Sequence, residues 1–340
     1  MLSFESDYIQ GAHPEVLKNL VKTNLEVLSG YGFDRYCDNA KAKIKALCGD
    51  DAEVFLLNGG TQTNQIVIDT MLEPYQGVLC ADTGHINTHE AGAIEFTGHK
   101  VLALKNELGK IKANDLSKHL ETFYADENHD HCVFPGMVYI SHPTEYGTLY
   151  TLDELENISQ ICKKYSLKLY LDGARLGYGL MSSDTDVTLK DISRLVDVFY
   201  IGGTKVGALC GEAIVFTHNN APRHFFTSIK QHGALLAKGR LLGVQFDTLF
   251  TDDLYFKISK HAIDMADLMR EAFINEGYEF YINTVTNQIF VILSESDYEN
   301  IKKSVSVGFW ERLPDNRVVV RFASSWATTK DDVKALINVL

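Results

Sequence analysis

The stretch LKLYLDGARLG, residues 167–177, decides the fold class. Its apolar residues predict a buried strand, and Asp172 follows at the strand's end with Arg175 close behind. In an open parallel sheet, ligands bind at the carboxyl edge of the strands. Asp172 is therefore a candidate site residue, although Asp followed by Gly after a strand is also an ordinary turn signal.

Six more strand-like segments surround this one in the first 245 residues, and amphipathic segments such as 151–165 lie between several of them. The alternation of strands and helices predicts an α/β fold with a seven-stranded, mostly parallel sheet between helices. The expected strands are 53–57, 77–81, 100–104, 136–141, 167–171, 196–201 and 212–216.

The pattern changes after about Phe246. A long helical stretch, 254–276, precedes strand-like segments, and the chain closes on a helical one at 330–340. We predict a large domain over residues 1–245 and a small C-terminal α+β domain over 246–340, with roughly the first dozen residues packing on the small domain. The strands expected there are 287–293, 304–309 and 318–322.

Composition narrows the function classes. The net charge of −13 argues against a nucleic-acid or anionic-membrane partner. The first residues lack a basic segment followed by an apolar one, and no apolar run approaches the roughly 20 residues of a membrane span, so we expect neither a signal peptide nor a membrane helix. Six scattered cysteines without a CxxC pair indicate reduced thiols and a cytoplasmic protein.

A second strand runs into a glycine-rich segment, VDVFYIGGTKVGALCG, at residues 196–211. Glycine lets the backbone approach a ligand, and the small residues around Lys205 leave room for its amine. Burial lowers the pKa of a lysine and so provides the neutral amine that an imine requires. The alternative is a solvated loop lysine, which the apolar flanks disfavour.

The segment VFLLNGGTQTNQ, residues 54–65, joins a strand to a helix through two glycines. Free amides at the helix start, together with the Thr61 hydroxyl, predict a phosphate cradle, although a plain threonine N-cap gives the same pattern. The segment has neither the GxGxxG nor the GK[ST] spacing, so dinucleotide and nucleoside-triphosphate sites are disfavoured.

The segment ADTGHINTHEAGA, residues 81–93, contains His85, His89 and Glu90 after another strand. A metal site is one interpretation, because two histidines four residues apart share a helix face. Glu90 follows the second histidine, however, so the pattern is not HExxH, and no third ligand is evident. We favour a His85 ring stacked on an aromatic cofactor, with Glu90 as a candidate proton carrier. The histidines in ADENHDHC, residues 125–132, are interpreted as part of an exposed loop, so no metal is predicted.

Taken together and in this order, these segments resemble the threonine aldolase family of pyridoxal-phosphate enzymes, which has the aspartate-aminotransferase fold. The resemblance covers nearly the whole chain. It begins at residues 6–8, similar to the family's SDT opening, passes 31–34, similar to YGxD, and ends at RVVVRFASSWATTKDD, residues 317–332. LDGAR with its downstream lysine is the specific part.

The resemblance implies pyridoxal 5'-phosphate as the cofactor. Lys205 would form the covalent imine with it and later move protons, and His85 would stack on its ring. Asp172 would pair with the pyridinium nitrogen, so that the ring acts as an electron sink. The residues implied to hold the phosphate are Gly60, Thr61 and Thr204.

Three further residues are implied to bind the substrate carboxylate: Ser6, Arg175 and Arg321. A forked guanidinium suits a planar carboxylate. Arg175, which follows Asp172 closely, is also expected beside the cofactor.

Two stretches depart from the family pattern. Glu145 in SHPTEYGTLY lies near the position where the family has a histidine that contacts the substrate hydroxyl. SIKQHGALLAKGR, residues 228–240, replaces a glycine-rich GGGMRQ segment and keeps Lys230 and Lys238 as candidate phosphate contacts that reach a neighbouring subunit.

The resemblance implies cleavage of a β-hydroxy-α-amino acid of the threonine, allo-threonine or phenylserine type to glycine and an aldehyde. The candidate bases are Glu90, Glu145 and a water held by His85. One alternative is a β-eliminating lyase for cysteine-like or serine-like amino acids, and another is a catalytically silent scaffold. By analogy with the family we expect a homodimer or homotetramer with active sites shared between subunits.

Overall fold

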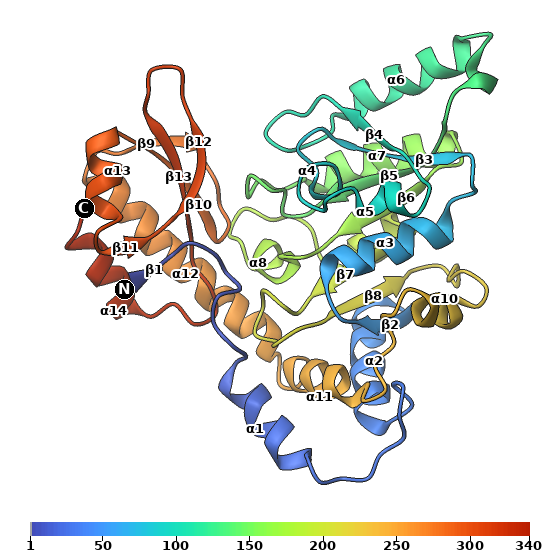
Figure 1. Cartoon of the computed structure of the whole chain (residues 1–340), viewed down its shortest axis with the longest axis horizontal. Helices are drawn as coiled ribbons and strands as arrows, with labels where there is room; N and C mark the ends of the chain where they lie inside the picture. The colour runs from blue at the N-terminus through green and yellow to red at the C-terminus, as the bar shows by residue number, and fades with distance from the viewer. Residues whose placement is uncertain (1) are drawn as a thin grey trace.

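The predicted large sheet is confirmed. A computed structural model describes residues 2–340, so Met1 lies outside the described part of the chain. The sheet has seven strands, and only β8 runs antiparallel to its neighbours (Figure 1). In spatial order the strands are β2 (Glu53–Leu57), β8 (Glu212–Phe216), β7 (Val198–Gly202), β6 (Lys168–Asp172), β5 (Phe134–Ser141), β3 (Gln76–Ala81) and β4 (Val101–Leu104).

Alternate side chains of these strands enter two different cores. On β6, for example, Leu169 and Leu171 face one core and Tyr170 faces the other. This is the period of two that a pleated strand imposes. Because both faces are covered by helices, the strands are apolar almost throughout, as the sequence predicted.

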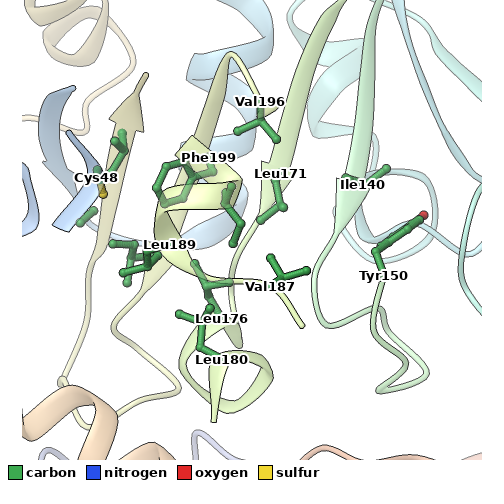
Figure 2. Close-up of a cluster of buried hydrophobic side chains, with 14 of the residues drawn as sticks. Cys48, Ile140, Tyr150, Leu171, Leu176, Leu180, Val187, Leu189, Val196 and Phe199 are labelled. Carbon is green, nitrogen blue, oxygen red and sulfur yellow. The ribbon is translucent and has the colours of Figure 1, made fainter. Parts of the chain in front are cut away.

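Figure 2 shows part of the first core, where Leu171, Val196 and Phe199 meet Ile140, Tyr150 and side chains from the adjacent helices. The helices that contribute to this face include α1 (Pro14–Thr23), α2 (Arg35–Cys48), α6 (Ala113–Ala125), α7 (Leu152–Lys164), α8 (Leu176–Leu180), α9 (Leu189–Leu195) and α11 (Arg240–Leu249). Those on the opposite face are α3 (Gly60–Met71), α4 (His85–Thr88), α5 (Ala93–Phe96) and α10 (Phe225–Gln231). A short 3-10 turn, η1, spans His129–His131.

The helix expected over 151–165 is present as α7, and its own sequence defines where it begins. Thr151 caps α7 by accepting from the Glu154 amide, and the Glu154 side chain accepts from the Thr151 amide in return. This reciprocal capping box satisfies two amides that the helix start leaves free.

The C-terminal part forms a small α+β unit, as predicted. Its antiparallel sheet has the order β12 (Gly308–Arg312), β13 (Val318–Ala323), β10 (Gln288–Leu293) and β9 (Glu279–Ile282). Two helices, α13 (Glu295–Ile301) and α14 (Lys330–Ile337), accompany it. A separate pair joins β1 (Leu2–Ser3), near the N-terminus, to β11 (Val305–Ser306) in parallel, and Phe4 is buried in the small unit's core.

One strand prediction was wrong. The segment 304–309 forms two strands rather than one, because β11 pairs with β1 while β12 turns to pair with β13. A contiguous apolar run does not reveal that its two halves have different partners.

A single helix, α12 (Leu254–Asn275), connects the two units and runs between them in Figure 1. Its first half, with Tyr255 and Ile258, belongs to the core of the large sheet. Its second half, with Met269 and Phe273, belongs to the core of the small unit. The two cores therefore share a helix, and the boundary at 245/246 remains a prediction. Among residues 2–340, no helix combines the length and apolarity that a membrane span requires.

Candidate active site

The carboxyl edge of the large sheet carries the site. A cavity of about 330 Å³ opens there, bordered by the turns that follow β2, β3, β5, β6 and β7 and by the start of β8. Parallel strands bring residues distant in sequence together at this edge. The predicted site residues that line the cavity are Gly60, Thr61, His85, Glu90, Asp172, Arg175, Thr204 and Lys205.

Lys205 follows β7 and points its amine at this cavity. Within residues 2–340 the amine makes neither an ion pair nor a hydrogen bond, and its nitrogen lies 5.9 Å from the centre of the Tyr8 ring. Burial, reinforced by the positive charge of Arg175, lowers the pKa of Lys205, while Asp7 and other carboxylates partly oppose the shift. A lysine in these surroundings provides a neutral amine more readily than one in water.

Asp172 ends β6 and receives four hydrogen bonds. Its Oδ1 accepts from the Tyr200 hydroxyl at 2.5 Å and the Ala174 amide at 2.9 Å. Its Oδ2 accepts from the Tyr139 hydroxyl at 2.5 Å and from Asn64 at 3.1 Å. Burial alone would raise the pKa of Asp172, but the His85 charge and these donors lower it, so the group remains a carboxylate.

Three tyrosines surround that carboxylate from adjacent strands. Tyr139, Tyr170 and Tyr200 each lie two residues before the end of their strand, and all three side chains enter the same core. Burial raises their pKa values well above the usual range, so the hydroxyls remain donors. This cluster was not predicted, although a tyrosine two residues before the end of each of three strands was a visible signal in the sequence.

His85 lines the cavity, and the buried Glu90 side chain supports its ring. Its Nδ1 lies 2.6 Å from Glu90 Oε1, and the amide of Asn64 donates to the same oxygen at 2.8 Å. The His85 side chain is 37% exposed, whereas the Glu90 side chain is 0% exposed. The single side-chain nitrogen of Asn64 also donates to Asp172, and its side-chain carbonyl accepts from the Tyr170 hydroxyl at 2.7 Å. One side-chain amide thus joins the His85 and Asp172 groups.

Glu145, where the sequence departs from the family pattern, also lies in the cavity. Its Oε1 accepts from the His85 amide at 2.9 Å and from the Ser141 hydroxyl at 2.7 Å. Burial raises the pKa of Glu145. A carboxyl with a raised pKa in a cleft is suited to exchanging protons.

The predicted phosphate cradle begins α3. Gly59 precedes the helix, and no side chain caps its first amides. A side chain at Gly60 would place its Cβ 3.2 Å from the Tyr200 hydroxyl, so the glycine keeps this corner open. Uncapped amides at a helix N-terminus favour an anion. Thr204 lines the cavity too, but its hydroxyl already donates to Glu212 at 2.8 Å.

Arg175 forms a buried ion pair with Asp7, for which no role was predicted. Its Nε and Nη2 donate to the two oxygens of Asp7 at 2.6 and 3.0 Å, and Asn287 donates to Asp7 as well. Arg175 opposes the burial of Asp7 and helps lower the pKa of Asp7 to about 2. Two of the three guanidinium nitrogens are therefore occupied from within the chain.

Arg321 reaches the same region from β13 in the small unit. It borders a hollow of about 470 Å³ that also touches His85, Arg175 and Lys205. Its two terminal nitrogens donate to Gln288 and to the Glu5 carbonyl, while Nε is buried with no partner among residues 2–340. Ser6 lies nearby in sequence with a buried, unpartnered hydroxyl, but it does not line either hollow.

The remaining candidates lie elsewhere. Lys230 and Lys238 are exposed and outside both hollows, and Lys230 packs over the Tyr31 ring. No cluster of three or more His, Cys, Asp or Glu side chains within residues 2–340 is arranged to hold a metal ion.

Comparison with known proteins identifies the family. Residues 3–295 match the family model described as beta-eliminating lyase. A low specificity L-threonine aldolase from Pseudomonas aeruginosa is 31% identical over 340 residues, covering 98% of this chain and 95% of the relative. A solved threonine aldolase from Leishmania major has a TM-score of 0.96 at 39% identity and covers 100% of this chain and 98% of that one.

The chain belongs to the threonine aldolase family.

More distant structures share the fold of this threonine aldolase family member. An aspartate aminotransferase from Thermus thermophilus has a TM-score of 0.70 at 12% identity, covering 100% of this chain and 90% of that one. At that identity the likeness shows the fold alone, and it confirms the predicted aminotransferase-like architecture.

Proposed function

We propose that this chain is a pyridoxal-phosphate-dependent carbon–carbon lyase that cleaves threonine-type β-hydroxy-α-amino acids to glycine and an aldehyde. The observation that carries the proposal is the unpaired amine of Lys205, in one cavity with the four-fold hydrogen-bonded Asp172 carboxylate. The close similarity to proteins named low specificity L-threonine aldolase supports the reaction class.

The residues of the cavity fit pyridoxal phosphate. The uncapped start of α3 and the open corner at Gly60 suit the phosphate, and Lys205 offers an amine for the aldehyde. Asp172 offers a carboxylate for a protonated ring nitrogen, and His85 offers a flat ring. When bound, the cofactor supplies an electron sink for the bond that breaks at the α-carbon.

The chain's own groups hold and orient the amino acid. We assign the substrate carboxylate to Arg321, which borders the open hollow, and to the remaining nitrogen of Arg175. Fixing that carboxylate also fixes which bond at the α-carbon faces the ring, and such orientation accounts for much of an enzyme's acceleration. The Ser6 hydroxyl is proposed as an additional donor.

The proton of the β-hydroxyl is assigned to His85 or Glu145. Both line the open hollow, whereas Glu90 is buried behind His85. We therefore propose that Glu90 orients His85 rather than contacting the substrate. General base catalysis of this kind contributes typically ~10²–10⁴-fold.

The product formed from defined substrates tests the reaction. Both threonine diastereomers and phenylserine should give glycine and the corresponding aldehyde, and serine and cysteine should give little pyruvate. Pyruvate as the main product would replace the aldolase with the β-eliminating lyase. The absence of any product, in protein that binds the cofactor, would favour the scaffold.

Replacement of Lys205 tests the cofactor. Lys205→Ala should lose the borohydride-reducible linkage to pyridoxal phosphate and nearly all turnover, because no other lysine lines the cavity within residues 2–340. Lys190→Ala, at an exposed position, is the matched control and should keep both. A reduced adduct at wild-type level in Lys205→Ala would contradict the assignment.

We also propose a homo-oligomer with shared sites in a reducing compartment such as the cytoplasm. The only cationic side chains that line the cavity in residues 2–340 are Lys205, Arg175 and His85 when protonated, which leaves the phosphate corner without a lysine or arginine of its own. Lys230 and Lys238 are exposed and available to a neighbouring copy. Sedimentation measures the assembly, and loss of cofactor affinity in Lys230→Ala or Lys238→Ala would support the shared site.

A further inference from the structure

Glu212 is a buried carboxyl at the heart of the site that the proposed mechanism does not use. It is the first residue of β8 and pairs with Gly202, the last residue of β7. Only 4% of Glu212 is exposed, and it lines the same cavity as Lys205. Its position therefore adjoins the turn that opens the connection between β7 and β8 and carries the lysine.

Both oxygens of Glu212 hold that turn. Oε2 accepts from the Gly203 amide at 3.0 Å, and Oε1 accepts from the Thr204 hydroxyl at 2.8 Å. The neighbouring Gly211 strengthens the attachment, because its carbonyl accepts from the amides of Gly203 and Thr204 and its own amide donates to the Thr204 hydroxyl. The residues immediately before Lys205 are thus fixed from one side by residues 211–212.

The carboxyl has no cation of its own. Glu212 makes no ion pair within residues 2–340, although Lys205 is near enough for the two charges to affect each other. Burial, with the like charge of Asp172, raises the pKa of Glu212 to about 8, and Lys205 opposes that shift. A buried carboxyl and a buried amine in one cavity titrate as a coupled pair.

We propose that Glu212 is a positioning residue for Lys205. It fixes the turn that carries the lysine and, in its ionised form, supplies a negative charge that favours the protonated amine. The inference rests on the proposed function only in taking Lys205 as the reactive lysine. Glu212 shares with Asp7 and Asp172 the role of opposing the Arg175 charge, so removing its carboxylate would make the amine neutral at lower pH. Other ionisable groups facing the pair are Asp7, Asp172, Tyr170, Tyr200 and Tyr255.

The test measures the protonation of Lys205 without substrate or cofactor. Full-length protein freed of cofactor is trace-labelled with acetic anhydride at a series of pH values, and the Lys205 peptide is quantified by mass spectrometry. In Glu212→Gln the labelling midpoint of Lys205 should fall by about one pH unit, the size expected when one neighbouring charge is removed from a partly buried site. The exposed Lys190 is the internal reference, and the exposed Glu127→Gln is the matched control variant.

An unchanged Lys205 midpoint in folded Glu212→Gln overturns the proposal. Glu212 would then only hold the turn by hydrogen bonds and would not affect the protonation of Lys205. If that variant does not fold, the reciprocal measurement decides. The infrared band of the Glu212 acid, assigned by its shift in Glu212→Asp, should titrate at higher pH in Lys205→Met than in the parent protein. An unchanged titration would again overturn the proposal, whereas the product assay on threonine is unaffected by either result.

Discussion

Asp172 illustrates how much one residue of this site depends on its neighbours. Four donors converge on it, and two of them are tyrosine hydroxyls whose pKa values are raised so far that they stay protonated. These donors, together with the nearby His85 charge, keep the group a carboxylate, so its charge remains available to a ligand.

Asp172→Asn should lower kcat/KM by about 10–100-fold with the fold retained. The estimate takes the loss of a charge-assisted hydrogen bond as about 1.5–3 kcal/mol and converts it at about 1.4 kcal/mol per tenfold change. Tyr139→Phe is the matched control, because it removes one of the four donors and keeps the charge. Steady-state kinetics and circular dichroism are the measurements, and activity of Asp172→Asn within a few-fold of the parent would make Asp172 a turn residue only.

Arg321→Ala should lower kcat/KM for the amino acid by one to two decades and leave cofactor affinity almost unchanged. Arg321 borders the hollow in which the substrate carboxylate would bind, and such a charge-assisted pair contributes roughly 1.5–3 kcal/mol. Arg321→Lys should recover little, since an ammonium cannot form the forked geometry. Paired titrations with cofactor and amino acid separate the two effects, and unchanged amino-acid affinity and turnover would remove Arg321 from the site.

The sequence predicted those site residues that belong to short motifs. Lys205, Asp172 and His85 were found because glycine-rich turns after apolar strands mark the carboxyl edge of a sheet. Asp7, Asn64 and Glu212 were missed, because their importance arises from partners 168, 108 and 8 residues away in the chain. Such pairings follow from the strand order, which the sequence pattern did not reveal.

Among the elements, the N-terminal segment at residues 2–7 connects the two units. β1 pairs with β11, and four residues later Asp7 clasps Arg175 at the end of β6. The segment has little helix or strand of its own, so its order depends on tertiary attachments such as these and the burial of Phe4 in the small unit's core. For strands with a continuous apolar sequence, the predicted ends lie within two residues of the observed ends. β1 is only two residues long and gave no local signal.

The Asp7–Arg175 ion pair should make the free energy of unfolding depend on pH under acidic conditions. The pKa of Asp7 is about 2 in the folded chain against 3.8 ordinarily, so its contribution is fully present above pH 4 and is lost as pH falls toward 2. The difference corresponds to about 2 kcal/mol. Urea unfolding at pH 7 should therefore show Asp7→Asn less stable by about that amount, with the gap closing toward pH 2. The exposed Asp38→Asn is the control, and equal stability of Asp7→Asn and parent at pH 7 would contradict the prediction.

For the whole molecule, α12 determines how the two units unfold. Because one helix contributes to both cores, loss of either core removes packing from the other. We expect a single cooperative thermal transition despite the two sheets.

Asp264→Pro tests this coupling. Asp264 is exposed and lies between Ile263, in the core of the large sheet, and Met265, in the core of the small unit. Proline in a helix interior costs about 3 kcal/mol or more and breaks the helix, so calorimetry should resolve two transitions. Asp264→Ala removes the same side chain without breaking the helix and should keep one. A single transition in folded Asp264→Pro would mean that the units are coupled by other contacts.

The pairing of β1 with β11 also has a consequence for synthesis on the ribosome. Translation produces Leu2 and Ser3 about 300 residues before their partners Val305 and Ser306. Domains generally begin to fold as they are made, starting from the N-terminus. The large sheet can therefore assemble early, while Leu2 and Ser3 remain unpaired until Val305 and Ser306 are made. The attachment of β1 to the small unit therefore forms only after β11 has been made, long after Asp7 and Arg175.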